Sequence, residues 1–522
     1  MRLTRTRRVV VLIVASLASL AAWELAARLG LSQLGVLAPP SAVVVELAQN
    51  AGLYANNFAA TAWVAARGWF WGDLAAIVLA VLFVQFRVLE LLLQRLALVL
   101  YCLPLVAVMP LLQLTFDPDT ARVVLAGLSV FFTTLVGTML GLRSADGGQL
   151  TVVRAWGGGG LAALRFVRTP TGIPAILTGL QIGAAAATLG AVFGEFIGAD
   201  RGLGVLLING LQQLHLAQVF AVAVLATLMA AVPYGLLGIA RRILVPWSTG
   251  LSTAAAEAPG RGSALRRIGN AIGWAVASVA VIIGAWWLYL IAFGVTPFVG
   301  KSPAVVWTYL TSLPGAAQNR ADLVEALGVT LVHAGAGYAA GLLIGILVAT
   351  VFVLVPPLEL AFTPLTVALR SVPIVALIPV LIVLFGRGLP GVVAITTIVT
   401  FFPTLANVQQ AMSRVPSDAL VLMRSYDASV AQTLWRLRLP TALPAIFASA
   451  RIAAPAAILG ATLAEWLATG DGLGHMIVSA RAFHNYTQLW AAAVLLAAVS
   501  VVFYSLVSAA ERAVLSRFTV AR

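Results

Sequence analysis

The residues able to carry chemistry are few in this chain, and none of them is arranged as an active site. The segment Gly294-Val-Thr-Pro-Phe-Val-Gly300-Lys301-Ser302 comes near to a phosphate-binding loop, but five residues separate its glycines where that motif has four. Lys301 is also the only lysine in the chain. The single cysteine, Cys102, excludes an intrachain disulfide, and the histidines lack metal-ligand spacing. We therefore expect no catalytic residue, no metal site and no cofactor in this chain.

Two acidic residues, Glu195 and Glu465, stand near the ends of long apolar segments. A carboxylate in or near hydrocarbon is costly, and such residues are often functional. Two interpretations stay open for them. They line or gate a solute path, or they lie at the membrane surface and bond to the turns that contain Gly202 and Gly472.

The composition is that of a membrane protein. Apolar residues make up 61% of the chain and charged residues 10%, with a mean hydropathy of +1.01. The net charge of +14 would favour a nucleic-acid partner in a soluble domain. Here the arginines fall in short breaks beside apolar runs. The orientation of the chain in the membrane therefore explains the positive charge more simply than a nucleic-acid partner does. We expect membrane lipid around the chain and no nucleic acid.

The chain contains two copies of one sequence pattern. The stretch from Arg168 to Ile176 recurs from Arg438 to Ile446, at an offset of 270 residues as from Pro170 to Pro440. Glu195 recurs in the same way as Glu465. A repeat of this length predicts two structurally equivalent halves.

Apolar runs long enough to cross a bilayer occur six times in each half. This pattern predicts an all-α polytopic membrane protein of about twelve transmembrane helices in two parallel six-helix repeats. The predicted spans are 9–29, 58–84, 88–113, 120–143, 173–198 and 217–240, then 268–293, 327–355, 358–385, 390–412, 445–468 and 490–511.

The distribution of arginines predicts the orientation, because short cytoplasmic loops retain Lys and Arg. Arginines gather in the loop after the fourth span of each half, in the central linker and in the C-terminal tail, whereas the opposite loops hold few. We therefore expect both termini in the cytoplasm, with the chain in the plasma membrane. An even number of spans per half makes the halves parallel.

The domain boundaries follow from the repeat and from composition. We predict a first domain over 1–247, a flexible linker rich in Gly, Pro and Ser over 248–267, and a second domain over 268–522. The basic N-terminus followed by an apolar run is similar to a signal peptide, but the run is long enough to span. We expect an uncleaved first span.

Each half has one long cytoplasmic loop between its fourth and fifth spans. In the second half Ser417 opens a short helix that runs to about Tyr426, and Ser429 and Gln432 form a capping box for a second helix. We expect that second helix to end before Pro440, because proline disfavours helical geometry in the preceding residue. The first half has the glycine run 157–160 instead of a box, so its second helix should begin less firmly.

These loops resemble the coupling loop of binding-protein-dependent ABC importer permeases. The likeness lies in the stretch from Asp418 to Ser429 followed by Arg438-Leu-Pro440. Glu465-Trp466 and the later Gly472-Leu-Gly474, with Arg370-Ser-Val-Pro373 and Pro379, are similar to the nitrate, sulfonate and taurine branch of that family. The chain thus looks like two type I permease domains fused in tandem.

The resemblance implies partners. Two separate ATPase subunits would hydrolyse Mg-ATP in the cytoplasm, and an extracytoplasmic binding protein would deliver a small solute. Sulfonates and nitrate are the implied substrates, while vitamin precursors such as thiamine pyrimidines stay an alternative. The residues implied to couple to the ATPases are Arg154, Gly157, Gly158, Arg168, Pro170, Pro174, Arg424, Asp427, Ala428, Ser429, Arg438, Pro440 and Pro444.

Proline inside apolar runs suggests where spans bend, because it leaves an unpaired carbonyl and a kink. We predict a pore or gate role for the helices with such prolines and for the two carboxylates. The rival hypotheses are an ion-gradient-driven transporter of two parallel six-helix halves, a channel and a membrane scaffold. The predicted pore or gate residues are Pro104, Pro110, Glu195, Pro373, Pro379 and Glu465.

Overall fold

The structure is a computed structural model that describes residues 14, 17–18, 20–31, 37–196, 198–246, 264–359, 362 and 374–516. Helices and short connections account for these residues, and no strand occurs among them. This confirms the predicted all-α class. The linker 248–267 lies mostly outside the described residues, as do the first thirteen residues and the last six.

In the first half, helical residues 20–26 lead into a short π-helical turn, η1 (Ala27–Leu31). Four long helices and one bent pair then form its body. In chain order the helices are α2 (Pro40–Gln49), α3 (Ala51–Gln85), α4 (Arg87–Cys102), α5 (Leu105–Gln113), α6 (Pro118–Arg143), α7 (Gly147–Ala155), α8 (Gly160–Ala163), η2 (Leu164–Arg168), α9 (Thr169–Phe196), α10 (Leu203–Gln212) and α11 (Leu216–Leu244).

The second half repeats this order of elements. Its long helices α14, α17, α20 and α22 correspond to α3, α6, α9 and α11. In chain order the helices are α12 (Ala264–Ala292), α13 (Pro303–Thr311), α14 (Ala316–Leu354), α16 (Ile374–Phe385), α17 (Leu389–Ser413), α18 (Ser417–Ser425), α19 (Val430–Thr433), η4 (Leu434–Arg438), α20 (Leu439–Ala464), η5 (Glu465–Thr469), α21 (Gly472–Ala482) and α22 (Tyr486–Leu515).

The membrane-spanning helices agree with the sequence where the structure describes them. Eight helices among the described residues are long and apolar enough to cross a membrane, and the α4–α5 pair makes a ninth if it counts as one span. Of the three other predicted spans, 9–29 and 358–385 include residues that the structure leaves undescribed, whereas 268–293 coincides with helix α12.

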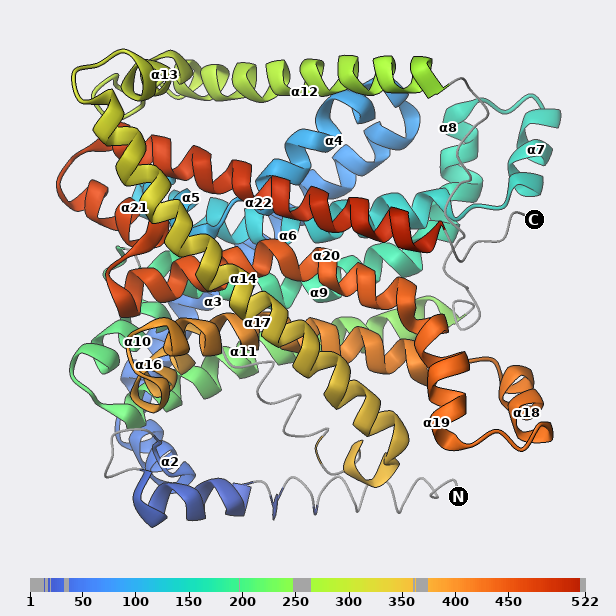
Figure 1. Cartoon of the computed structure of the whole chain (residues 1–522), viewed down its shortest axis with the longest axis horizontal. Coiled ribbons are helices and arrows are strands. Elements are labelled where there is room, and N and C mark those ends of the chain that lie inside the picture. Colours follow the sequence, from blue (N-terminus) through green and yellow to red (C-terminus); the bar gives the residue numbers. More distant parts are fainter. Residues whose placement is uncertain are drawn as a thin grey trace.

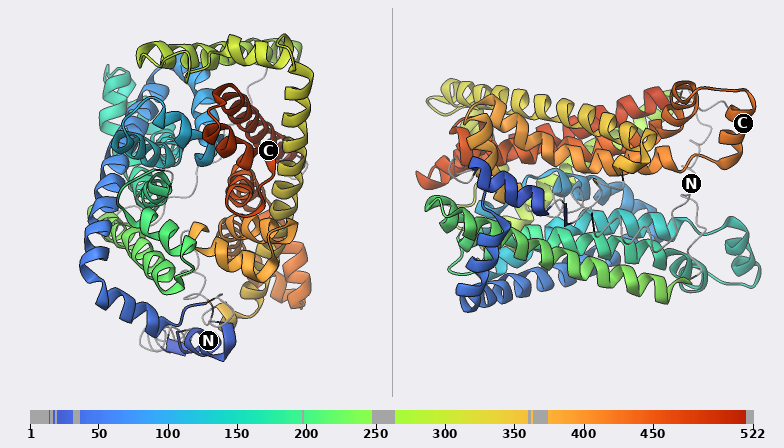
Figure 2. Two further views of the ribbon diagram at one scale, coloured as in Figure 1. Left: turned by 90° about the vertical axis from the view of Figure 1, so that its left-hand side faces the viewer. Right: turned by 90° about the horizontal axis from the view of Figure 1, so that it is seen from below.

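The long helices lie roughly side by side in one elongated bundle (Figure 1). The pairs α7–α8 and α18–α19 project from one end, which we call the loop end. Helices α10 and α21 lie at the opposite end, which we call the turn end (Figure 1). Seen from the side, the two halves form two layers with both projecting loops at the same end (Figure 2). The halves are therefore parallel, as predicted.

The predicted span 88–113 is not one straight helix. Its two parts, α4 and α5, meet at 99°. Leu103 and Pro104 form the break with extended backbone, because Pro104 disfavours helix in the residue ahead of it. Helix α5 thus folds back as a short segment, and it packs against α20 and α21 of the other half.

Helices α3 and α6 pack closely because glycines remove side chains from their contact. A Cβ atom on Gly72 would lie 2.6 Å from Val130 Cγ2 and 2.7 Å from Gly127 Cα. In the second half a Cβ atom on Gly345 would lie 2.9 Å from the Thr404 side chain. These small residues therefore serve close helix packing, which matters in a membrane because the surrounding lipid is as apolar as the side chains and gives no hydrophobic driving force for helix association.

The buried core differs between the two ends of the bundle. At the turn end, a single cluster of buried apolar residues includes Met109 and Phe193 of the first half and Ile458 and Leu473 of the second. At the loop end, the clusters around Phe83 and around Met412, among others, each contain residues of one half alone. Among the described residues the halves therefore share a core only at the turn end.

Candidate functional site

The short helices of the two loops stand apart from the bundle. No residue of α7 or α18 is buried. Trp156 and Tyr426 hold equivalent places at the ends of these helices, with 88% and 79% of their surface exposed. Large exposed apolar side chains in a projecting segment are typical of an interaction surface.

Both loops turn at a residue with left-handed backbone. Gly157 has φ 76° and Asp427 has φ 49°. The next amide closes the turn in each half, from Gly158 to the Val153 carbonyl over 2.9 Å and from Ala428 to the Met423 carbonyl over 3.0 Å. Glycine reaches this conformation at little cost, and aspartate is among the few other residues that do. The two bends therefore share one geometry despite their different sequences.

The helix caps are distributed differently in the two loops. Ser429 and Gln432 form the predicted capping box at the start of α19, while α8 begins at Gly159 without a side-chain cap. The first helices show the reverse. Asp146 caps α7 by accepting from the Gly148 amide over 3.0 Å, whereas α18 begins at Pro416 without a side-chain cap. The expectation that the second loop is better specified thus holds for its second helix only.

The prolines after the loops do not end the helices, so the expected stop before Pro440 is wrong. Pro170 and Pro174 lie inside α9, and Pro440 and Pro444 lie inside α20. Helix α19 runs through η4 into α20 without a break. A π-helical turn precedes the first proline of each pair, and its wider spacing relieves the clash between the proline ring and the preceding turn.

The arginines implied in coupling lie on both sides of each bend. Arg154 and Arg424 are in the last turns of α7 and α18. Arg168 and Arg438 close the π-helical turns. Arg168 donates to the Val84 carbonyl over 3.3 Å, which ties the first loop to the end of α3. A force on this loop would thus reach a membrane-spanning helix.

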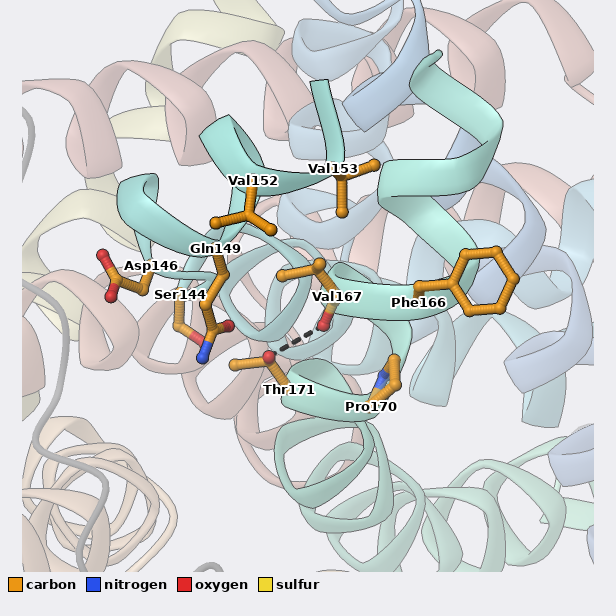
Figure 3. A pocket seen from close by; sticks show the side chains of 9 residues that line it. All are labelled: Ser144, Asp146, Gln149, Val152, Val153, Phe166, Val167, Pro170 and Thr171. Atoms are coloured by element: carbon orange, nitrogen blue, oxygen red, sulfur yellow. Dashed lines mark hydrogen bonds between the residues drawn. The ribbon is translucent and has the colours of Figure 1, made fainter. Parts of the chain in front are cut away.

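A cavity of about 630 Å³ lies beneath α7 (Figure 3). Gln149, Val152 and Val153 of α7 form one wall, and Val167 and Thr171 of η2 and α9 face them. The side chain of Thr171 donates to the Val167 carbonyl over 2.8 Å. Helix α7 is thus separated from the bundle by open space on its inner side.

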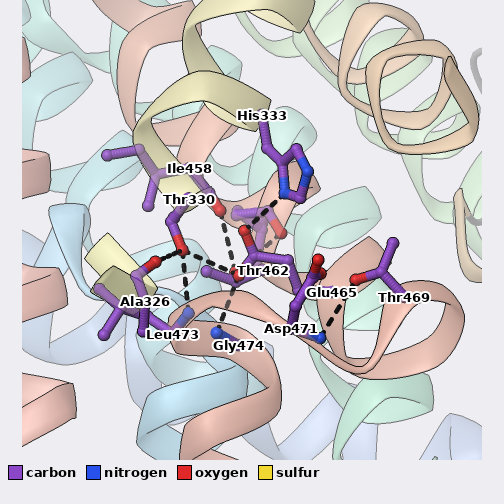
Figure 4. Close-up of polar contacts among 11 residues, drawn as sticks. Ala326, Thr330, His333, Ile458, Thr462, Glu465, Thr469, Asp471, Leu473 and Gly474 are labelled. Atoms are coloured by element: carbon purple, nitrogen blue, oxygen red, sulfur yellow. Dashed lines mark hydrogen bonds and ion pairs between the residues drawn. The ribbon is translucent and has the colours of Figure 1, made fainter. Parts of the chain in front are cut away.

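At the turn end, Glu465 is fully buried and holds the start of α21 (Figure 4). Its Oε2 accepts from the Gly474 amide over 2.9 Å and from the Thr330 hydroxyl over 3.0 Å. The Thr330 oxygen in turn accepts from the Leu473 amide over 2.9 Å. His333 Nδ1 lies 3.0 Å from Oε1 of the same carboxylate. We call Thr330, Glu465 and the amides of 473 and 474 the second clamp.

The first half contains the same arrangement, which we call the first clamp. Glu195 is 1% exposed, and its Oε2 accepts from the Gly204 amide over 2.9 Å and from the Thr61 hydroxyl over 2.8 Å. Thr61 also accepts from the Leu203 amide over 2.8 Å. The added contact differs, since Asn57 here accepts from the Gly202 amide over 2.7 Å. Both carboxylates thus bond to the turns, as the second interpretation of the sequence has it.

The glycines of the two turns make room for these carboxylates. Gly202 and Gly472 have φ 137° and 78°. A Cβ atom on either would collide with the Glu side chain of its clamp. A Cβ atom on Gly474 would lie 2.8 Å from Thr462 Cα. The repeated Gly-Leu-Gly sequence is therefore a steric requirement of the clamp.

The predicted pore or gate prolines fall in different settings. Pro104 stands at the sharp bend before α5, and Pro110 is buried within α5. Pro379 belongs to helix α16, but its side chain lies outside the described part of the structure. Pro373 lies outside the described residues altogether. The clamps lie at the turn end and the coupling loops at the loop end, so the structure separates the two predicted groups along the bundle.

The sequence prediction missed the threonines of the clamps and an aromatic contact between the halves. Trp466 packs edge-to-face on Phe193 and Phe196, with ring centroids 6.1 and 5.4 Å away. A signal was present for the aromatic pair, since an aromatic residue directly follows Glu195 and Glu465 alike. Thr61 and Thr330 are also repeated, but threonine is common in such helices and gave no distinct signal.

Comparison with known proteins identifies relatives that each match less than half of this chain. A permease described as probable ABC transporter permease protein, from Haemophilus influenzae, is 28% identical over 176 residues, 34% of this chain and 72% of the relative. The formylaminopyrimidine transport permease protein ThiX of Halalkalibacterium halodurans is 33% identical over 28% of this chain and 60% of its own length. The taurine transport system permease protein TauC of Escherichia coli is 27% identical over 40% of this chain and 76% of the relative.

A family model matches the chain twice, over residues 72–250 and 341–519. The two matches contain α6 to α11 and α17 to α22, and therefore both loops and both clamp carboxylates. They cover more than half of the chain and confirm the tandem arrangement of two permease units. The chain therefore belongs to the family of inner membrane components of binding-protein-dependent transport systems.

Proposed function

We propose that this chain forms the whole membrane pore of an ATP-driven importer. Two copies of a separate ATPase subunit dock on the loop end, one on α7 and one on α18. An extracytoplasmic binding protein delivers a small solute to the turn end. ATP and Mg²⁺ bind to the partner subunits, and this chain contributes no catalytic residue.

One observation carries the proposal: two equivalent helices project from the same end without a single buried residue. An amphipathic or apolar helix has little reason to stay folded there unless another protein covers it. The exposed rings of Trp156 and Tyr426 supply apolar anchors of the kind that dominate interfaces. Family membership supports the same assignment and disfavours an ion-gradient transporter, a channel or a scaffold.

The orientation follows from the same assignment. The loop end faces the cytoplasm, where ATP is present, and this places both termini on that side. The arginines Arg154, Arg168, Arg424 and Arg438 all lie near the loop end, which agrees with the enrichment of basic residues in cytoplasmic loops.

The proposed substrate is a small anion such as a sulfonate or nitrate. The taurine and aliphatic sulfonate permeases among the relatives support this class. A pyrimidine precursor of thiamine is the second candidate, supported by the 33% identity with the formylaminopyrimidine permease. Titration of the purified cognate binding protein with taurine, nitrate and formylaminopyrimidine would separate the two classes.

Loss of the exposed rings tests the docking surface. The double variant Trp156→Ala/Tyr426→Ala should reach the membrane in normal amount but should no longer copurify with the ATPase, because each interface loses its anchor. Phe483→Ala removes an equally exposed ring at the turn end and serves as the matched control, with copurification unchanged. Normal copurification of the double variant would contradict the proposal.

A further inference from the structure

The contact between Phe196 and Trp466 joins two equivalent residues of the repeat. Each directly follows the carboxylate of its clamp, Glu195 in the first half and Glu465 in the second. Their ring centroids are 5.4 Å apart, with the ring planes at 78°. Equivalent residues of two symmetry-related units can touch only at or near the symmetry axis. The pair therefore lies on the approximate two-fold axis between the halves.

That axis runs along the bundle, because both coupling loops are at one end and both clamps at the other (Figures 1 and 2). A solute that crosses the membrane between two equivalent halves has to travel along this axis. The aromatic pair thus lies on the path of such a solute at the turn end.

The surroundings of the pair are closed. Phe193 and Phe196 are 1% and 4% exposed, and Phe193 is a second edge-to-face partner of Trp466. All three belong to or pack against the apolar cluster that both halves share. At the loop end the buried clusters around Phe83 and around Met412 each belong to one half alone.

We propose that Phe196 and Trp466 form the seal of the solute path at the turn end, and that each clamp makes its aromatic residue move with its own turn. This rests on the proposed transport function. The Glu carboxylate bonds to the amide at the start of α10 or α21, and the aromatic ring is the next residue along the chain. Displacement of a turn by a docked binding protein would therefore pull the ring away from the axis. Glu195 and Glu465 act as positioning residues in this device.

A cysteine pair tests the contact directly. In a Cys102→Ser background, Phe196→Cys with Trp466→Cys should be crosslinked by a short bifunctional methanethiosulfonate reagent in membranes that contain the chain alone. The matched control is Phe116→Cys with Phe293→Cys, a contact between the halves at 4.9 Å whose residues are not equivalent in the repeat. Failure of the first pair to crosslink, with the control pair crosslinked, would overturn the proposal.

The seal also predicts a response to the transport cycle. With the ATPase bound and trapped by ATP and vanadate, crosslinking of Phe196→Cys/Trp466→Cys should fall by about tenfold, while the control pair stays the same. Equal yields in both states would overturn the moving seal. If no ATPase assembles on the chain, the proposed function fails instead. The seal is then tested only by the reactivity of a thiol from the turn end, which is described next.

Access from the turn end needs no partner. A single Trp466→Cys thiol should react slowly with a membrane-impermeant thiol reagent added on that side, and Phe196→Ala should speed the reaction by about tenfold because it opens the path. Phe196→Tyr keeps a ring and should restore protection. A rate that does not respond to Phe196→Ala would show that the ring seals nothing.

Discussion

His333 Nδ1 lies 3.0 Å from Oε1 of Glu465, and the first half has no counterpart of this contact. Val64 occupies the equivalent place, three residues after the clamp threonine Thr61 just as His333 follows Thr330. Oε1 of Glu195 accordingly has no hydrogen-bond partner among the described residues. The two clamps share the amide contacts of the Glu and Thr side chains, and they differ in the partner of the second carboxylate oxygen.

We predict that His333→Val lowers stability without loss of the fold. The valine fits, as Val64 does in the first half, but Oε1 of Glu465 loses its partner, which costs about 1–3 kcal/mol. Thermal unfolding of the detergent-solubilised chain measures the effect. His475→Val is the control, because His475 makes no hydrogen bond to a described residue, and equal midpoints for the two variants would refute the prediction.

The clamp threonines should depend on their hydroxyl groups. Thr330→Val keeps the shape of the side chain but leaves the buried Leu473 amide without an acceptor, at a cost of about 1–3 kcal/mol. Thr330→Ser retains the hydroxyl and should lose much less. Because Thr61 makes the same two bonds in the first half, Thr61→Val should have a similar effect in the same thermal assay. A Thr330→Val protein with an unchanged unfolding midpoint would show that the hydrogen bonds of the Thr330 hydroxyl are not needed for stability.

The unequal helix caps give a prediction for the two loops. Asp146→Ala should speed amide hydrogen exchange in α7 and leave α18 unchanged, since loss of an N-cap costs about 1 kcal/mol. Ser429→Ala should do the same to α19 only. Ser417→Ala is the control, because the Ser417 hydroxyl contacts only the Asp418 side chain at 3.2 Å and caps no helix. Exchange that rises equally in both loops for either variant would contradict local capping.

Membrane orientation can be tested with one thiol at each end. In the Cys102→Ser background, Ser417→Cys at the start of α18 should react with an impermeant reagent only after the cells are opened. Phe483→Cys at the turn end, where the side chain is 83% exposed, should react in intact cells. The opposite pattern would invert the topology and remove the basis for ATPase docking on α7 and α18.

The sequence predicted the features that depend on neighbours along the chain or on repetition. The two halves, their apolar spans and the capping box at Ser429 are of this kind. Pro440 misled because proline alone does not show that a π-helical turn will accommodate it. Pro104 marked a break but could not give its 99° angle, which depends on what α5 packs against.

The clamps lay beyond such reasoning for a physical reason. The bond between Thr61 and Glu195 joins residues 134 positions apart, and nothing in the local pattern of α3 indicates that its one threonine faces the end of α9. The contact of Phe196 with Trp466 is more distant still and exists only once the halves meet. A repeated aromatic residue after each glutamate was visible, but its meaning required the position of the axis.

The presence of both clamps on one polypeptide has a genetic consequence. In a pore built from two copies of one gene product, a histidine beside one carboxylate would necessarily appear beside the other. Here a codon change at His333 or Asn57 alters one side only, so the two sides can diverge under separate selection. Such a chain also supplies its two unlike halves in equal amounts, and two copies of the same half cannot pair in place of the unlike pair.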